Sequence, residues 1–330
     1  MAFNLNNEFP PILRQYALYQ RNIKGLSNNT VSEYCLDLRT FFRFMKKHKN
    51  LVDINIDDEK IDLNDIDIAF INSISTLDIY EFMNFVSDEK NNKSSTRQRK
   101  STTLKSFFTY MYVHEKLISQ NPTENMLAPK KAKPLPRYLS LEQSVELLGA
   151  IDKNDENFER DFCIITLFLN CGLRLSELVG LNLSSFQHRN NKVSIFGKGN
   201  KERIVYLNEK CLDAVEEYIG VRPVEGIPNE SKNALFISKQ KKRISPKTVQ
   251  YIVKKYLAKI GLQDYSVHKL RHTAATLMYQ YGNVDIRVLQ EVLGHENLAT
   301  TEIYTHTSNK QIQDAVNTNP LNNIEIKKDE

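Results

Sequence analysis

The pattern of apolar and polar residues predicts helices throughout the first third of the chain. From Val31 to Met45 the apolar positions recur at i, i+3, i+4 and i+7, which is the spacing of one face of an amphipathic helix. Two further helices are predicted over residues 77–87 and from residue 94 onward. The acidic stretch 49–67 shows no such period, so it is predicted to be an irregular insertion between helices.

A proline-rich segment divides the chain. Residues 127–138 contain three prolines, which remove backbone donors and prevent a continuous helix. We therefore predict a linker at 127–138, between a helical domain over residues 1–126 and a second domain over residues 139–317. Residues 318–330 are polar and are expected to form a frayed tail.

The second domain combines helices with a small β-structure. Two short β-type runs, Val193–Phe196 and Arg203–Leu207, flank the glycine- and lysine-rich residues 197–201, which predicts a β-hairpin. Residues 158–170 form a long apolar run that ends at Gly172, a typical helix stop. Other helices are predicted after Ser140 and over about 209–220, 246–260, 267–281, 284–293, 298–304 and 309–316. The predicted fold class is therefore mainly α with a small β-sheet.

Charge is distributed unevenly along the chain, although the net charge is only +5. Residues 1–89 carry 9 Lys or Arg against 14 Asp or Glu, whereas residues 90–137 carry 11 against 2. Residues 231–263 carry 9 basic residues and no acidic one. Each basic block alone could be a solvated helix face, but two such blocks favour a polyanion such as nucleic acid. The predicted DNA contacts are Arg97, Arg99 and Lys100 in the first block and Lys241, Lys242 and Arg243 in the second.

Composition and motifs argue against several classes of protein. No apolar run approaches the ~20 residues that cross a bilayer, and no secretory leader is visible at the start of the sequence. The four cysteines lie far apart, which argues against a disulfide scaffold or a zinc site and favours a reduced cytoplasmic compartment. The sequence contains no P-loop, GxGxxG, HExxH or GxSxG motif.

The remaining candidates for chemistry are basic residues and tyrosines in the second domain. His268 and Arg271 lie three positions apart on one predicted helix, so they share a face and could converge on one phosphate. For this pair alone, a buried histidine beside a surface arginine is the simpler interpretation. His268 and His272 have the i, i+4 spacing of zinc ligands, but no third ligand is evident in the sequence.

Several segments in combination resemble the motifs of tyrosine recombinases, also called phage-type integrases. The boxes match in order and spacing, and the resemblance covers about residues 10–316, including a helical N-terminal part similar to the family's core-binding domain. One small departure is Cys171, where many members carry threonine. The matching segments are Cys171–Leu178, Gly197–Gly199, His268–Thr276, Leu293–Glu296 and Thr300–His306.

The resemblance implies a catalytic role for each matched residue. Tyr304 would attack a DNA phosphodiester and form a 3′-phosphotyrosyl link. Arg174 and Arg271 would bind the phosphate oxygens and offset the charge that builds in the transition state. Lys198 would act as the general acid that protonates the leaving 5′-oxygen.

Three further residues would support this chemistry, and some alternatives stay open. His268 would assist proton transfer from the tyrosine, His295 would hydrogen-bond a phosphate oxygen, and Glu177 would orient its neighbours. Taken singly, Arg174 could be only a structural partner of Glu177. The other candidates that the sequence allows are Lys201 in place of Lys198 and Tyr279 or Tyr281 in place of Tyr304.

The resemblance also implies a function. The simple build, without an extra arm-type DNA-binding domain, is similar to that of Xer-type recombinases, which resolve chromosome dimers. Integrases or transposases of phages and conjugative elements, type IB topoisomerases and non-catalytic DNA-binding proteins are the alternatives. The expected partner is double-stranded DNA with a specific recombination site, bound by a homo- or hetero-tetramer with a related recombinase, away from any membrane. No cofactor is expected, because arginines replace a metal in offsetting charge and the phosphotyrosine conserves bond energy without ATP.

Overall fold

The chain folds into two compact units, Met1–Lys133 and Pro134–Glu330, which we describe separately as the N-terminal and C-terminal units. A computed structural model describes residues 9–88, 94–126, 137–187, 191–196, 202–282 and 284–294. Residues 127–136 of the predicted linker lie outside this range, as does the predicted tail at 318–330. The domain limits drawn from the sequence therefore stay predictions.

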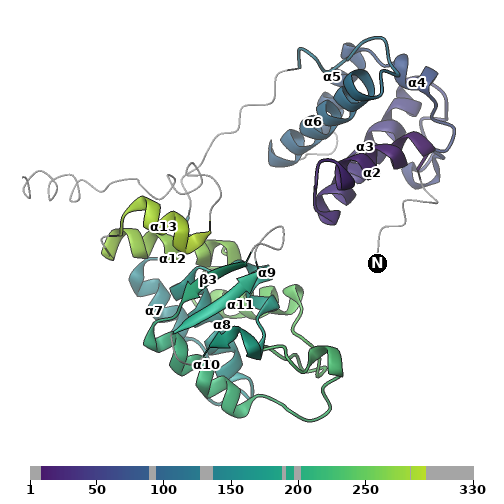
Figure 1. Ribbon diagram of the computed structural model, residues 1–330. Coiled ribbons are helices and arrows are strands. Elements are labelled where there is room, and N and C mark those ends of the chain that lie inside the picture. The colour runs from purple at the N-terminus through teal and green to yellow at the C-terminus, as the bar shows by residue number, and fades with distance from the viewer. Residues whose placement is uncertain are drawn as a thin grey trace, which may run out of the picture. The chain divides into compact units, whose positions relative to one another are not determined.

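The N-terminal unit is a bundle of helices around an aromatic core (Figure 1). Phe41 and Phe82 meet edge to face with ring centroids 5.0 Å apart, and Phe42 meets Phe107 in the same way at 5.7 Å. All four rings are fully buried, so they join three helices into one core. The helices are α2 (Pro11–Asn22), α3 (Asn28–His48), α4 (Ile68–Asn72), α5 (Thr76–Asp88) and α6 (Ser94–Thr109), which continues into the π-helical turn η2 (Tyr110–His114).

The longest of these helices, α3, shows how the local sequence sets helix limits. Its N-cap is Ser27, whose side chain accepts a hydrogen bond from the backbone N–H of Thr30. Its last turn carries Lys46, Lys47 and His48, which suit the negative end of the helix dipole. The helices predicted near residues 31–45, 77–87 and from 94 are confirmed, whereas α2 and α4 were not predicted. The 49–67 stretch is irregular as predicted, apart from one 3-10 turn.

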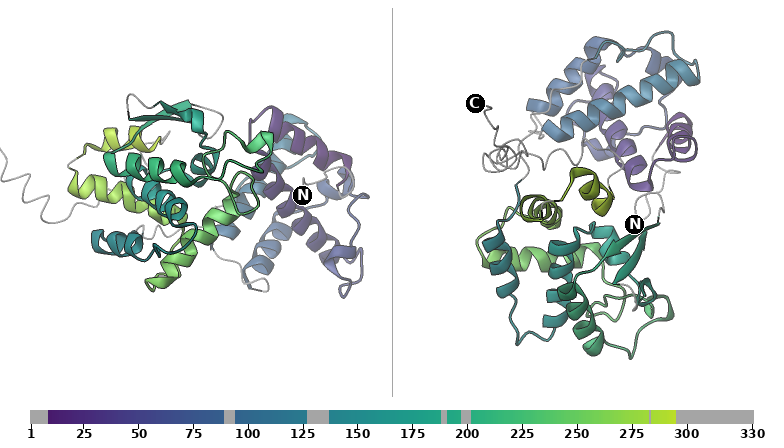
Figure 2. Two further views of the ribbon diagram at one scale, coloured as in Figure 1. Left: turned by 90° about the horizontal axis from the view of Figure 1, so that it is seen from below. Right: turned by 60° about the vertical axis from the view of Figure 1, so that its left-hand side comes forward.

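The C-terminal unit is built around α8 (Phe158–Cys171), a helix whose apolar residues face in all directions and are almost all buried. The other described helices of this unit are α7 (Leu141–Gly149), α9 (Leu175–Gly180), α10 (Glu209–Val221), α11 (Pro246–Lys259), α12 (Val267–Tyr281) and α13 (Ile286–Leu293). Of these, α7, α10, α11 and α12 contact α8 (Figures 1 and 2). The helices predicted in these regions are confirmed, except that α9 was not predicted and those near 298–304 and 309–316 lie outside the described residues.

A small antiparallel sheet lies on one face of these helices (Figure 2). Its strands are β1 (Phe186–Gln187), β2 (Lys192–Phe196) and β3 (Glu202–Tyr206), in the order β1-β2-β3. Strands β2 and β3 form the predicted hairpin, with Ile195 paired to Arg203. The chain between them, residues 197–201, lies outside the described range. The fold class is confirmed as mainly α with a small sheet.

Two glycines bring the ends of α8 and α13 together. Gly172 and Gly294 follow these helices with φ of +59° and +63°, the left-handed conformation that suits glycine. A Cβ on Gly172 would lie 2.9 Å from Cδ2 of Leu293, so a side chain at this position would require the leucine to shift. The two helix ends therefore meet next to Arg271, which lies 3.9 Å from the same Cβ position.

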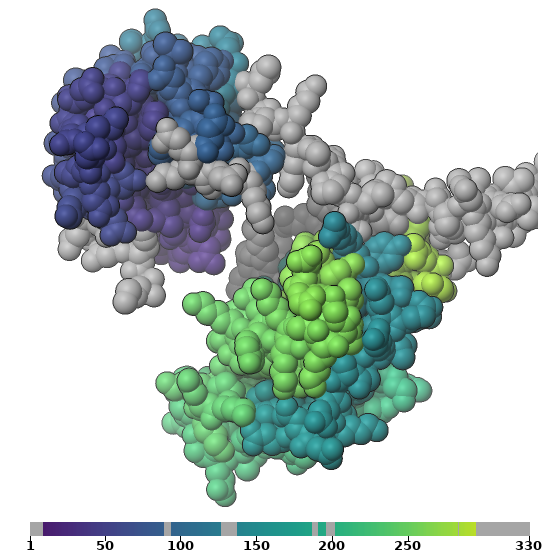
Figure 3. Space-filling view, turned by 180° about the vertical axis from the view of Figure 1, so that it is seen from behind, coloured from purple at the N-terminus to yellow at the C-terminus, as the bar shows by residue number. Residues whose placement is uncertain are grey.

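Helices α11 and α12 also cover the other side of the unit. In the view from behind, the light green side chains of α12 lie beside the teal of α7 (Figure 3). Lys259 at the end of α11 donates to the carbonyl of Ala150, 3.2 Å away, and Lys255 pairs with Asp155 at 2.9 Å.

Among the described helices of both units, none combines the length and the hydropathy that a membrane span requires.

Candidate active site

Glu177 is the centre of a cluster of arginines in the C-terminal unit. Its side chain is fully buried at the third position of α9, and Arg174 is the N-cap of the same helix. The backbone N–H of Arg174 donates to Oε2 of Glu177 at 2.7 Å, and its Nη1 donates to Oε1 at 2.8 Å. The ion pair that the sequence allowed between these two residues is present, and a third of the Arg174 side chain remains exposed.

Arg271 reaches the same carboxylate from α12. Its Nη1 lies 3.8 Å from Oε2 of Glu177 and donates to the carbonyl of Gly172 at 2.5 Å, while its Nη2 donates to the carbonyl of Leu293 at 2.6 Å. The side chain is almost fully buried. Arg174 and Arg271, which are far apart in the sequence, are therefore brought to one point by a shared acidic partner.

A third arginine, Arg203, belongs to this cluster and was missed in the sequence. It lies on β3 and donates from Nη2 to Oε2 of Glu177 at 3.0 Å. The strand period of two places Arg203 on the same face as Val205, which is buried. A charged residue on the inward face of a strand was the signal that could have identified it.

The arginines decide the charge state of Glu177. Burial alone would raise the pKa of this carboxyl, but hydrogen bonds and charge from Arg203, followed by those from Arg174, outweigh burial and hold the pKa below its ordinary value. Glu177 is therefore ionised at neutral pH, and its charge fixes the guanidinium groups around it.

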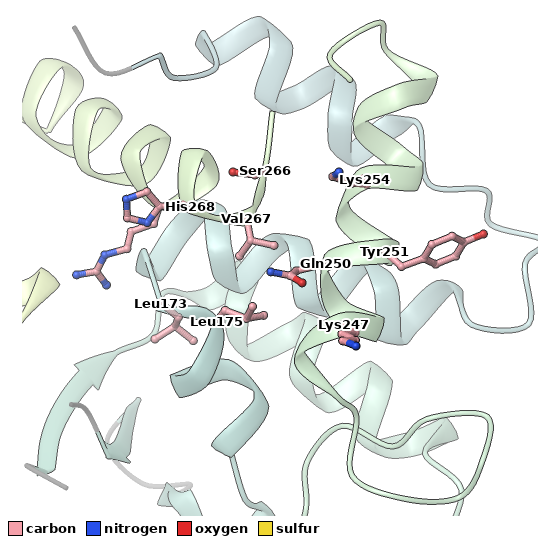
Figure 4. A pocket seen from close by; sticks show the side chains of 10 residues that line it. Leu173, Leu175, Lys247, Gln250, Tyr251, Lys254, Ser266, Val267 and His268 are labelled. Atoms are coloured by element: carbon pink, nitrogen blue, oxygen red, sulfur yellow. The ribbon is translucent and has the colours of Figure 1, made fainter. Parts of the chain in front are cut away.

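His268 lies beside this cluster at the start of α12. It shares a cavity of about 480 Å³ with Arg271, and Figure 4 shows this cavity between α12 and the exposed face of α11. Burial, and then the charges of Arg271 and Arg174, lower the pKa of His268. The imidazole is therefore neutral at neutral pH and able to accept a proton.

The α11 side of the cavity is polar and basic. Lys247, Gln250, Tyr251 and Lys254 recur at i, i+3, i+4 and i+7, so they form one exposed face of the helix (Figure 4). None of them was singled out in the sequence, although the basic block at 231–263 contains them. The helical period of its polar residues was the signal that could have separated them from their buried neighbours.

A second histidine, His272, contacts His268 edge to face with ring centroids 4.4 Å apart. Burial, together with the charges of His268 and Arg271, lowers the pKa of His272 to about 4. Among the described residues, no group of three His, Cys, Asp or Glu side chains could hold a metal ion.

The lowered pKa values of His268 and His272 predict that the stability of the protein depends on pH. Both pKa values are lower in the folded protein than the ~6.5 of an unfolded histidine. The contribution of the two neutral histidines to the free energy of unfolding is therefore complete above that pH and is lost as the pH falls below it. The free energy of unfolding should therefore decrease between about pH 7 and pH 5, before most carboxylates titrate. Urea unfolding at both pH values should show a smaller decrease in His272→Gln than in the wild type. Equal decreases would contradict the prediction.

Four candidates lie outside the described residues: Lys198, its alternative Lys201, His295 and Tyr304. Their roles stay predictions. Three of them lie close to described residues in the sequence: Lys198 and Lys201 belong to the segment between Phe196 and Glu202, and His295 follows Gly294.

Two of the predicted DNA contacts are corrected by the structure. Lys100 is buried in the N-terminal unit, where its amine lies 2.8 Å from Oδ1 of the equally buried Asp37. Arg243 donates to the carbonyls of Val179 and Leu181, so it fixes the end of α9. Lys100 and Arg243 are therefore not available as DNA contacts, because their charged groups are held by internal partners and, unlike Arg271, neither residue lines the cavity beside His268.

The other predicted contacts differ in whether their charged groups have partners within the protein. Arg99 pairs with Asp37 at 2.6 Å and with Glu33 at 3.0 Å, and Arg97 donates to Ser87 Oγ at 2.6 Å. Lys241 and Lys242 are exposed. These lysines are the members of the predicted set that are most accessible to a polyanion.

Comparisons with known proteins find relatives over most of the chain. Residues 137–311 match the profile of the Phage integrase family. The chain is 50% identical over 316 residues to tyrosine recombinase XerC of Caldanaerobacter subterraneus subsp. tengcongensis, covering 95% of this chain and 88% of that protein. It is 35% identical over 293 residues to tyrosine recombinase XerD of Proteus mirabilis, covering 88% and 86%.

Two solved structures share the fold. The XerH recombinase in its post-cleavage complex with palindromic difH gives a TM-score of 0.69 at 22% identity, covering 93% of this chain and 83% of that one. The Tn1549 transposon integrase with transposon right end DNA gives 0.69 at 19% identity, covering 92% and 98%.

Proposed function

This chain belongs to the Phage integrase family of tyrosine recombinases, and we propose that its Arg174, His268 and Arg271 surround one phosphodiester of duplex DNA during strand cleavage. It is an Xer-type site-specific recombinase, an enzyme that breaks and rejoins DNA strands. The observation that carries the residue assignment is the convergence of Arg174 and Arg271 on the buried carboxylate of Glu177. A carboxylate that holds two guanidinium groups in place preorganises them for an anion.

The reaction follows from the chemistry of the residues. The hydroxyl of Tyr304 attacks the phosphorus, the bond to the 5′-oxygen breaks, and a 3′-phosphotyrosyl link forms. His268, whose lowered pKa keeps it neutral, takes part in removing the phenolic proton. Lys198 gives a proton to the departing 5′-oxygen. His295 donates a hydrogen bond to a phosphate oxygen.

The arginines offset the charge that develops on phosphorus. A guanidinium stays protonated and presents a planar set of donors that matches two phosphate oxygens, which an ammonium group cannot do. In other enzymes each such preorganised donor lowers the barrier by roughly 3–4 kcal/mol. This stabilisation requires no metal ion. The phosphotyrosyl link retains the energy of the broken bond, so rejoining requires no ATP.

The exposed face of α11 provides a basic surface that contacts the DNA backbone beyond the cleaved phosphate. Lys247 and Lys254 on this face, with Lys241 and Lys242 nearby in sequence, carry positive charge toward solvent. Such contacts position a duplex through its backbone and make affinity fall steeply with salt. Tyr251, which is largely exposed on the same face, adds a flat aromatic contact.

The biological role that the chain's similarity favours is resolution of chromosome dimers. Its 50% identity to a XerC protein over nearly the whole chain supports this role over that of a mobile-element integrase. The active assembly is a tetramer on DNA, composed of this chain alone or with a related recombinase. In either case two recombination sites must be brought together before strands are exchanged.

Recovery of DNA that is covalently trapped on the protein tests this proposal. Bacteria that produce the tagged protein are lysed in denaturant with EDTA, and the attached DNA ends and the attached residue are identified. We expect 3′-linked DNA on Tyr304 at one short site in the host chromosome. DNA from the ends of a mobile element would favour the integrase role instead. Absence of attached DNA, or an adduct that forms in purified reactions only with a metal ion, would overturn the mechanism.

A further inference from the structure

Arg203 connects three segments of the C-terminal unit through one side chain. Its Nε lies 3.4 Å from Oε1 of Glu177 and its Nη2 lies 3.0 Å from Oε2, so the guanidinium donates hydrogen bonds to both carboxylate oxygens. Its Nη1 donates to the backbone carbonyl of Val292. Only 15% of the side chain is exposed. Its contacts are therefore internal, and they join β3, α9 and the end of α13.

Each of these segments leads to a proposed catalytic residue. Strand β3 begins directly after residues 197–201, which include Lys198. Glu177 on α9 holds Arg174 and Arg271. Val292 lies in the last turn of α13, three residues before His295. A shift of Arg203 would therefore change the relative positions of several groups that act on one phosphate.

The end of α13 is held by all three arginines of the cluster. Arg203 donates to the carbonyl of Val292, Arg271 to that of Leu293 at 2.6 Å, and Arg174 to that of Gly294 at 2.8 Å. These carbonyls lie at the negative end of the helix dipole, where cations are stabilising. Successive carbonyls are thus satisfied by side chains from α9, β3 and α12.

Close packing leaves Arg203 little freedom. A Cβ on Gly294 would lie 2.7 Å from Cδ and 3.0 Å from Nε of Arg203, so the arginine stem passes directly over the glycine. Glycine at this position therefore allows the left-handed backbone conformation and also leaves room for the side chain of Arg203.

We infer that Arg203 is a positioning residue for DNA cleavage, which holds Glu177 and the end of α13 in the arrangement that the catalytic groups require. The inference rests on the proposed function of Arg174, His268 and Arg271. Only a guanidinium can make these contacts together, because it offers several donors in one plane, whereas lysine offers one nitrogen. Retaining the positive charge alone should not retain the function.

Arg203→Lys tests the inference, because it keeps the charge and removes the planar set of donors. The measurement is single-turnover cleavage of a nicked duplex carrying the recovered recombination site, with protein in saturating excess, beside a separate measurement of the DNA Kd. We expect the cleavage rate at saturation to fall by about 10²-fold, as for a small misplacement of reacting groups. The Kd should stay close to that of the wild type.

Arg222→Lys is the matched control. Arg222 is also buried and donates to backbone carbonyls, those of Ala234 and Leu235 among them, but it makes no contact with Glu177. We expect this variant to lose thermal stability and to keep the cleavage rate of the wild type below its Tm. An equal loss of cleavage in both variants would mean that stability, and not positioning, explains the effect of Arg203.

A double variant tests whether Arg203 acts through Glu177. If both substitutions break the same contact, Arg203→Lys combined with Glu177→Gln should cleave no more slowly than the slower single variant. Rate losses that multiply would overturn positioning through Glu177.

The remaining outcomes are equally decisive. If the wild type forms no adduct, the proposed function fails and the inference falls with it. If the wild type cleaves and Arg203→Lys cleaves at the same rate, only the inference fails. A weaker Kd with an unchanged rate at saturation would make Arg203 a DNA-binding residue. If Arg203→Lys does not fold, Arg203→Gln replaces it, and failure of both to fold would make Arg203 a folding residue and overturn the inference.

Discussion

Tyr304→Phe is expected to bind recombination-site DNA and to form no covalent adduct with it. Phenylalanine lacks the hydroxyl oxygen that forms the bond to phosphorus, so the loss should be complete and not partial. The arginines that bind the phosphate are unchanged, so DNA affinity should be retained. The measurement is a denaturing gel of protein incubated with a nicked duplex, on which the wild type produces a protein–DNA band of reduced mobility.

Tyr279→Phe and Tyr281→Phe are the matched controls for this prediction. Both tyrosines lie on α12, where Tyr279 packs against the small cluster that includes Leu289, and Tyr281 is 67% exposed. Neither is expected to reduce adduct formation. An adduct that survives in Tyr304→Phe, or one that is lost in Tyr281→Phe, would move the nucleophile to another residue.

Lys198→Ala is expected to slow cleavage of an ordinary phosphodiester by about 10²–10⁴-fold, the usual contribution of a well-placed proton donor. The departing 5′-oxygen is a poor leaving group unless it is protonated. Replacing that oxygen by sulfur removes the need for a proton, because a thiolate leaves readily. Cleavage of the 5′-sulfur duplex by Lys198→Ala should therefore return close to the wild-type rate.

Lys201→Ala is the control for the alternative assignment within the same turn. We expect it to cleave the oxygen and sulfur duplexes at rates near those of the wild type. The assignment of Lys198 would be wrong if sulfur failed to rescue Lys198→Ala, or if Lys201→Ala showed the slow rate and the sulfur rescue instead.

Local patterns in the sequence determined most of the secondary structure. The predicted helix over 267–281 is α12 with the same limits, and the buried helix over 158–170 differs from α8 by one residue at its end. Helix and strand periods are visible within a few turns of chain, so they need no knowledge of distant contacts. Helix α9, with six residues, is too short to show a period, which is why it was not predicted.

The candidate site was predictable only in part. The family resemblance selected Arg174, Glu177, His268 and Arg271, and the structure brings all four to one place. The sequence could not separate structural charges from exposed ones within a basic block. Lys241 is exposed and Arg243, two residues later, is held by internal carbonyls, although both are simply basic in the sequence.

The sequence by itself therefore determined most of the helices, the two strands of the hairpin, the family and the residue types of the chemistry. Only the tertiary structure decided which charged groups meet, because Glu177, Arg203, Arg271 and the end of α13 come from four separate elements, α9, β3, α12 and α13. The physical reason is that a charge buried away from water needs a partner, and its partner is chosen by the packing of distant segments and not by neighbours in sequence.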